Sequence, residues 1–222
     1  QDHKRAFEGD VGPNTGGMGT YSFANHSLPF LKNREVLDAQ KTNELVAKQL
    51  LKKTGVPFVG VLYGGFMLTQ RGVKVIEYNA RLGDPEAMNV LCLMKTDFLK
   101  VCDQIISGSL SKNSVEFEEL STVCKYAVPN GYPNKPAKGF VVDCKIEDLD
   151  VYLASVKSSD GQVVACGSRT AAAIGKDKNV FVAEKFAERK ISSVGGDLFH
   201  RKDIGTKELI SRRIDRMEKI LR

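Results

Sequence analysis

Three polar residues, Glu77, Asn79 and Arg81, occupy alternate positions after the β-branched run at 73–76. Side chains alternate between the two faces of a β-strand, so a strand that continues through Asn79 places all three on one face. A carboxylate and an amide oxygen side by side are hard ligands, which suit Mg²⁺ holding the phosphates of a nucleotide. Arginine adds a fixed fork of donors for a carboxylate or phosphate oxygen. The spacing predicts a cation and phosphate site, although an exposed strand with a solvated polar face has the same spacing.

The residues that follow end this strand. Gly83-Asp84-Pro85-Glu86 combines strand breakers with a residue type that caps helices. We expect a helix to begin here, with Asp84 as its N-cap and Pro85 as its first helical residue, and to end near Met94.

A second candidate site lies near the start of the chain. Residues 10–19 read Asp-Val-Gly-Pro-Asn-Thr-Gly-Gly-Met-Gly, which is too rich in turn formers for a helix or a central strand. Glycines let the backbone approach a ligand closely and point successive N–H groups at an anion. Asp10 at the start of the stretch, with Lys4 and Arg5 upstream, favours a ligand-binding loop over an ordinary surface loop.

Hydrophobic periodicity predicts the elements that position these residues. Before residue 110 we expect a helix at 33–53, a strand at 58–69, a turn at 70–72 into the strand with Glu77, and a helix at 96–108. The polar, acidic stretch 111–120 makes the best domain boundary. Beyond it we expect strands at 122–128, 140–144, 162–165 and 170–174, a helix at 177–193 and a last helix after residue 205. Asp160-Gly161 is typical of a hairpin turn.

Composition places the chain among globular proteins of the cytoplasm. It has 222 residues, of which 42% are hydrophobic and 27% charged. No apolar run is long enough to span a membrane, and no signal peptide is evident. The 5 cysteines form no C-x-x-C pair, which favours reduced thiols in a reducing compartment.

The net charge of +6 does not indicate nucleic-acid binding. Most of the excess lies at 201–222, on a predicted helix and without interleaved aromatic residues, as expected for a solvated helix face. The charged start Gln1-Asp2-His3-Lys4-Arg5 has no helix or strand signal, and we expect it to continue from a longer protein.

Several of these segments, taken together, resemble the phosphoribosylamine–glycine ligase family (glycinamide ribonucleotide synthetases). They have that family's order and approximate spacing: residues 1–5, 12–19, 77–86, Gly131-Tyr132-Pro133 and Arg201-Lys202-Asp203-Ile204-Gly205. The resemblance implies an α+β fold. Residues 1–119 would form the second half of an ATP-grasp domain, an antiparallel sheet with helices. Residues 120–222 would form a small mixed α/β domain.

The resemblance also implies an activity. Members of the family use ATP to phosphorylate glycine, and the amine of 5-phosphoribosylamine attacks the glycyl phosphate to give glycinamide ribonucleotide in purine biosynthesis. The implied cofactors are ATP and Mg²⁺ or Mn²⁺, with Glu77 and Asn79 as metal ligands. Arg81 would lie against the acyl phosphate or the substrate phosphate, held by Asp84 and Glu86. The implied substrate-binding residues are Lys4, Arg5, Asp10, Asn14, Thr15, Gly16, Gly17 and Met18, with Asp10 taking the ammonium group of glycine and the loop binding through its N–H groups.

The chain departs from the family pattern in three ways. The family's N-terminal domain and the lid that encloses adenine precede the motif at 1–5, so we expect the chain to be inactive alone and to need those domains as partners. Leu82 replaces the family's usual phenylalanine, and Gly167-Ser168-Arg169 replaces Gly-Gly-Arg. The alternatives are another ATP-grasp carboxylate–amine ligase and a non-catalytic fragment or interaction module.

Overall fold

The computed structural model describes residues 1–144 and 150–221. Contacts divide the chain into two compact units. The first unit comprises residues 1–28, 84–93 and 119–211, and the second comprises 29–83, 94–118 and 212–222. The domain boundary expected at residue 119 stays a prediction, because compact units group residues by contact and not by family domain.

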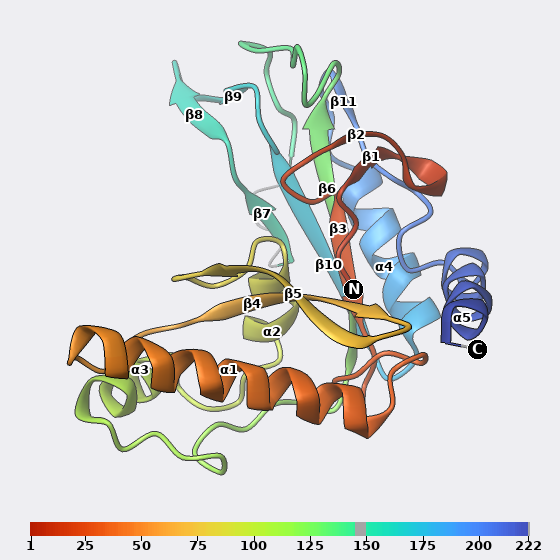
Figure 1. Ribbon diagram of the computed structural model, residues 1–222. Helices are drawn as coiled ribbons and strands as arrows, with labels where there is room; N and C mark the ends of the chain where they lie inside the picture. Colours follow the sequence, from red (N-terminus) through yellow and green to blue (C-terminus); the bar gives the residue numbers. More distant parts are fainter. Residues whose placement is uncertain (145–149, 222) are drawn as a thin grey trace. The chain divides into compact units, whose positions relative to one another are not determined.

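Within the described residues, the first unit contains a five-stranded sheet in the order β11-β6-β10-β7, with β3 also paired to β6 (Figure 1). Every pairing is antiparallel, and every residue of the central strand β6 is buried. The strands are β3 Gly19–Ser22, β6 Ser121–Pro129, β7 Val151–Leu153, β10 Ala171–Asp177 and β11 Leu198–Phe199.

Helix α4, Val180–Ser192, covers one face of this sheet behind β6 and β10 (Figure 1). It begins after Asn179, whose side chain accepts a hydrogen bond from the N–H of Phe181. The helix lies directly on β10, because a Cβ built on Gly175 would lie only 1.8 Å from the carbonyl oxygen of Ala183. Only glycine permits this close approach of helix and strand.

Shorter elements complete the first unit. Within its described residues, one hairpin pairs β1 with β2 and another pairs β8 with β9, and the second turns at Asp160-Gly161 as predicted. The bounds are β1 Arg5–Phe7, 3₁₀ helix η1 Glu8–Asp10, β2 Val11–Asn14, α2 Glu86–Leu91, β8 Val156–Ser159 and β9 Gln162–Ala165. Helix α5, Lys207–Leu221, begins in the first unit, where Leu209 and Ile210 are buried.

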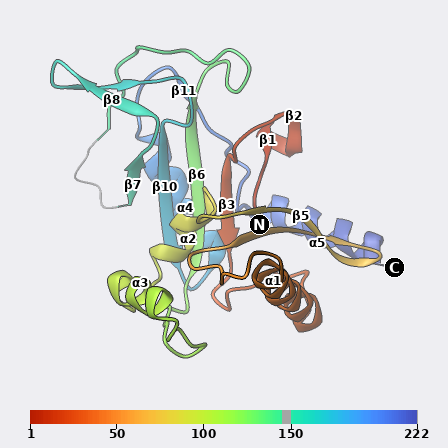
Figure 2. The ribbon, with the colours of Figure 1, turned by 60° about the vertical axis from the view of Figure 1, so that its left-hand side comes forward.

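The second unit is built on a helix and a hairpin. Helix α1, Asn33–Thr54, runs beside the antiparallel hairpin of β4, Tyr63–Thr69, and β5, Gly72–Asn79 (Figure 2). The hydroxyl of Tyr78 on β5 donates to Asn43 Oδ1 of α1 at 2.9 Å. Helix α3 spans Phe98–Ser107, between the capping side chain of Asp97 and left-handed Gly108.

The predicted α+β class is confirmed, and so are the helices near 33–53, 96–108, 177–193 and after residue 205. Other predictions are wrong. Strand β4 begins only at Tyr63, and Val141 and Asp143 form isolated bridges in place of a strand at 140–144. Helix α2 begins at Glu86 after Pro85, so Asp84 is not its N-cap, and the helix ends at Leu91. None of the helices in the described ranges is both long and apolar enough for a membrane span.

A buried ammonium group joins three parts of the first unit. Lys125 Nζ on β6 donates to Glu184 Oε1 and Glu188 Oε2 of α4, each at 2.6 Å, and to the carbonyl oxygen of Lys202 at 2.8 Å. Its three N–H donors therefore have three acceptors, as a buried charge requires. Burial alone would raise the pKa of Glu188, but hydrogen bonds and charge from Lys125 and His200 outweigh burial and lower that pKa.

We expect Lys125→Met to destabilise the first unit by about 3 kcal/mol at pH 7, because two carboxylates lose their shared cation. Since folding lowers the pKa of Glu188, its contribution is present above the ordinary value of 4.5 and is lost as pH falls below it. The stability difference between wild type and variant should therefore shrink in acid. Urea unfolding at pH 7 and pH 4, with exposed Lys185→Met as control, measures this. A difference independent of pH would contradict the assignment.

Candidate functional site

The predicted metal ligands lie near the end of β5, in the second unit. Glu77 pairs with Gly65 and Asn79 pairs with Tyr63, while the register shifts between Gly65 and Phe66. Phe66 pairs with Val75, so Ile76 is an extra residue directly before Glu77. Such a bulge changes the direction of the strand and of its side chains. Glu77 is exposed and Asn79 is half-buried.

Arg81 lies on the same side as Asn79, as the alternation predicts. Its Nη2 donates to Asn79 Oδ1 at 3.2 Å, and its Nη1 donates to the carbonyl oxygen of Leu82 at 2.8 Å. Asn79 Oδ1 has two lone pairs, so one remains for a cation. Glu77 and Asn79 thus offer side-chain oxygens without enclosing an ion.

The composition of this pair fits Mg²⁺ or Mn²⁺ bound together with phosphates. Among the described residues, no group of three or more His, Cys, Asp or Glu side chains could hold a metal ion. A cation at Glu77 and Asn79 would need its remaining ligands from water and from another molecule. Mg²⁺ in nucleotide sites is bound in this way, through one or two protein groups, several waters and phosphate oxygens.

The glycine-rich loop belongs to the first unit, and the N–H groups of its residues 15–18 already have acceptors. The N–H groups of Thr15, Gly17 and Met18 donate to the carbonyl oxygen of Lys4, to Thr15 Oγ1 and to the carbonyl oxygen of His3. The N–H of Gly16 donates to the hydroxyl of Tyr132 at 3.3 Å. The sequence-based expectation that these four amides bind a ligand is therefore not supported. A ligand at 15–18 would meet carbonyl oxygens or side chains.

Asp10, expected to bind an ammonium group, is paired with a buried arginine instead. Its backbone is left-handed, with φ 61°, and its Oδ1 accepts from Arg201 Nη1 at 3.0 Å. Arg201 is 1% exposed and also forms a bidentate pair with Asp203. Burial alone would raise the pKa of Asp203, but hydrogen bonds from Arg201 and the N–H of Gly9 lower it. These contacts fix the β1–β2 hairpin to the segment around residue 203.

The other predicted substrate-binding residues differ in their contacts and in their burial. Lys4 Nζ pairs with Asp2 Oδ2 at 2.8 Å, and Arg5 Nη1 donates to the carbonyl oxygen of Gly12 at 2.8 Å. Asn14 pairs with Arg5 in the β1–β2 ladder. Met18 is fully buried, so its side chain belongs to the core. Its N–H donates to the carbonyl oxygen of His3 and its carbonyl oxygen accepts from the N–H of Tyr126, so its backbone is also held within the unit.

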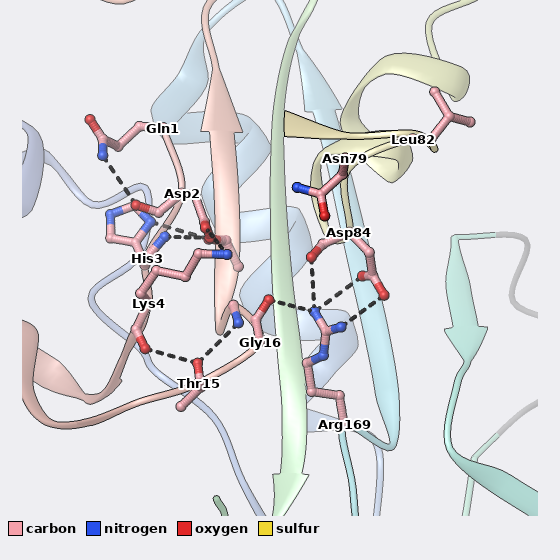
Figure 3. Close-up of polar contacts among 12 residues, drawn as sticks. Gln1, Asp2, His3, Lys4, Thr15, Gly16, Asn79, Leu82, Asp84 and Arg169 are labelled. Atoms are coloured by element: carbon pink, nitrogen blue, oxygen red, sulfur yellow. Dashed lines mark hydrogen bonds and ion pairs between the residues drawn. The ribbon is translucent and has the colours of Figure 1, made fainter. Parts of the chain in front are cut away.

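Asp84 is held by residues that are distant in sequence (Figure 3). Its Oδ1 accepts from the hydroxyl of Tyr126 at 2.9 Å, and its Oδ2 accepts from Arg169 Nη2 at 2.8 Å. Glu86 is the first residue of α2, and its charge adds to the effect of burial in raising the pKa of Asp2. The interaction of Asp84 with Arg169 replaces the capping role predicted from the local sequence.

The structure thus brings part of the predicted site together. Residues 15–17, Asp84 and Arg169 meet in the first unit, whereas Glu77, Asn79 and Arg81 belong to the second. Sequence reasoning noted Arg169 only as part of a Gly-Ser-Arg variation, and it did not identify Tyr126. The signal for Arg169 was an arginine directly after Gly167-Ser168 in a predicted loop. The roles assigned to all these residues stay predictions.

Comparison with known proteins identifies related chains. Residues 1–87 match the family model for the ATP-grasp (A) domain of phosphoribosylglycinamide synthetase, and residues 122–207 match the model for its C domain. The phosphoribosylamine–glycine ligase of Methanosarcina barkeri is 47% identical over 221 residues, which is 99% of this chain and 51% of that protein. Its counterpart from Methanococcus maripaludis strain C5 is 50% identical over 226 residues, covering 99% of this chain and 50% of the relative.

A solved structure of the same enzyme is also similar to this chain. The crystal structure of phosphoribosylamine–glycine ligase from Thermotoga maritima has a TM-score of 0.78 and 31% identity, over 92% of this chain and 50% of that one. The chain therefore spans about half the length of the relatives it matches. With two domain models of one family matching most of its residues, the chain belongs to the phosphoribosylglycinamide synthetase family.

Proposed function

We propose that the protein containing this chain ligates glycine to 5-phosphoribosylamine with ATP, by way of glycyl phosphate, to give glycinamide ribonucleotide for purine biosynthesis. The observation that carries this proposal is the arrangement of Glu77, Asn79 and Arg81 at the end of β5. Family membership supports the choice of substrates.

The proposed roles follow from the chemistry of phosphoryl transfer. A divalent cation held by Glu77 and Asn79 would neutralise charge on the phosphoryl group. Arg81 would present guanidinium N–H groups to the acyl phosphate. The loop at 12–19, with Lys4 and Arg5, would receive the substrates through carbonyl oxygens and side chains, while Asp10 stays paired with Arg201. Because phosphoryl transfer depends on positioning and electrostatics, no covalent nucleophile is needed. Asp84, in the turn before α2, and Glu86, the first residue of α2, would contribute acidic side chains.

The half that this chain does not cover in its relatives would supply the lid around adenine. All five cysteines are free, which supports a cytoplasmic enzyme. Another ATP-grasp carboxylate–amine ligase is the second candidate, supported by the Glu-x-Asn-x-Arg arrangement alone. Replacing glycine by other carboxylates in the assay distinguishes the two.

We expect Glu77→Gln in the full-length protein to lower kcat by a factor on the order of a hundred or more, because a neutral amide no longer offsets the charge of the cation and phosphates. Steady-state ligation at saturating Mg²⁺ measures this. Glu44→Gln, an exposed carboxylate on α1, provides the control and should keep wild-type turnover. Wild-type kcat in Glu77→Gln would remove Glu77 from the metal site.

Residues 1–222 alone should bind MgATP only at millimolar concentration or weaker, about −4 kcal/mol, and should not ligate glycine. Glu77 and Arg81 are exposed, so their contacts with phosphate are screened by solvent. A lid would also be needed to protect an acyl phosphate from water. Calorimetry and a phosphate-release assay test this, and micromolar binding or measurable ligation would show that the chain carries a complete site.

A further inference from the structure

One guanidinium group in the first unit bonds both to the glycine-rich loop and to the turn at 84–85 (Figure 3). Arg169 Nη1 donates to the carbonyl oxygens of Gly16 and Asp84, each at 3.1 Å, and reaches Asp84 Oδ1 at 3.2 Å. Its Nη2 donates to Asp84 Oδ2 at 2.8 Å. The Arg169 side chain is only 17% exposed. Its fork of donors is thus directed at protein oxygens from two segments.

The guanidinium of Arg169 lies over the aromatic ring of Tyr126 on β6. The centroid of that ring lies 4.7 Å from Arg169 Cζ, in cation–π geometry, and the Tyr126 hydroxyl donates to Asp84 Oδ1 at 2.9 Å. Burial and the charge of Asp84 raise the pKa of Tyr126, so the hydroxyl keeps the proton that it donates. Asp84 and Arg169 are therefore both fixed to the central strand of the sheet.

The loop and the turn approach each other where the loop has no side chains. A Cβ built on Gly17, at φ 119°, would lie 2.7 Å from Pro85 Cδ. A Cβ on Gly16 would lie 3.1 Å from Arg169 Cζ. The two glycines thus leave room for Pro85 and for the guanidinium, and the loop backbone contacts both.

We propose that Arg169 is a positioning residue that holds the loop at 15–18 against the Asp84-Pro85-Glu86 turn, so that the loop is ordered before substrate binds. This inference rests on the proposed function, in which that loop receives the substrates. The role uses the planar fork of arginine, because Nη1 reaches oxygens of both segments while Nη2 completes the bidentate pair with the Asp84 carboxylate. A lysine at the same position keeps the charge but cannot form the bidentate pair.

The first arm of the test needs no substrate. Hydrogen exchange at the amides of residues 15–18 should become about tenfold faster or more in Arg169→Gln and Arg169→Lys, since hydrogen bonds to a charged group are lost. Arg189→Gln removes another arginine stacked on an aromatic ring, Phe186, and should leave exchange at 15–18 unchanged. Unchanged exchange in Arg169→Gln overturns the proposal. If Arg169→Gln does not fold, Arg169→Lys decides in its place, because it keeps the charge and loses the bidentate pair, and unchanged exchange in that variant overturns the proposal.

The second arm uses ligation by the full-length protein. Both Arg169 variants should raise KM for glycine or phosphoribosylamine by about tenfold. In the variants the loop is not ordered beforehand, so part of the substrate-binding energy is spent on ordering it. If Arg169→Lys keeps wild-type KM, charge alone suffices and the positioning role is overturned. If the wild-type protein does not ligate glycine, the proposed function fails, while hydrogen exchange still decides whether Arg169 orders the loop.

Discussion

The first unit depends on one constraint, which is that β6 is buried along its whole length and still carries polar side chains. A buried polar group without a partner is costly, so each of these side chains must find one inside the protein. Lys125 binds Glu184 and Glu188 of α4, and Tyr126 binds Asp84 before α2. Thr122 accepts a hydrogen bond from Asn89 of α2 at 3.0 Å. The partners of β6 thereby fix the positions of both helices.

The same constraint builds the part of the candidate site that lies in this unit. Lys125 and Tyr126 are neighbours on a strand, so their side chains point to opposite faces of the sheet. On the face of Tyr126, Asp84 and Arg169 hold the glycine-rich loop. On the other face, Lys125 contacts the carbonyl oxygen of Lys202, next to the arginine that binds Asp10. Segments on both faces thus stabilise the loop at 10–18. In the second unit, the hydrogen bond from Tyr78 to Asn43 has the corresponding role, because it fixes β5 to α1.

The sequence predicted features that depend on local order and missed those that depend on distant partners. The alternation of Glu77, Asn79 and Arg81 follows from the period of a strand. The contact between Arg81 and Asn79 agrees with it for that pair, and the place of Glu77 on the same face stays a prediction. Asp84 was wrongly assigned as a helix cap, because its local sequence contains no sign of Arg169 or Tyr126. The amides of the glycine-rich loop were expected to be available, but their acceptors, such as Tyr132 and His3, lie outside the loop. Short segments such as 140–144 were also unpredictable, since their pairing depends on the strand that lies opposite.

We propose that Glu77 and Asn79 hold the divalent cation in the full-length protein. Anomalous scattering from crystals of the full-length protein, grown with Mn²⁺ and a non-hydrolysable ATP analogue, tests it most directly. The expected map has a manganese peak within about 2.5 Å of a Glu77 carboxylate oxygen and of Asn79 Oδ1, with phosphate oxygens completing the coordination. A manganese peak bound to the phosphates but to neither of these residues would contradict the account.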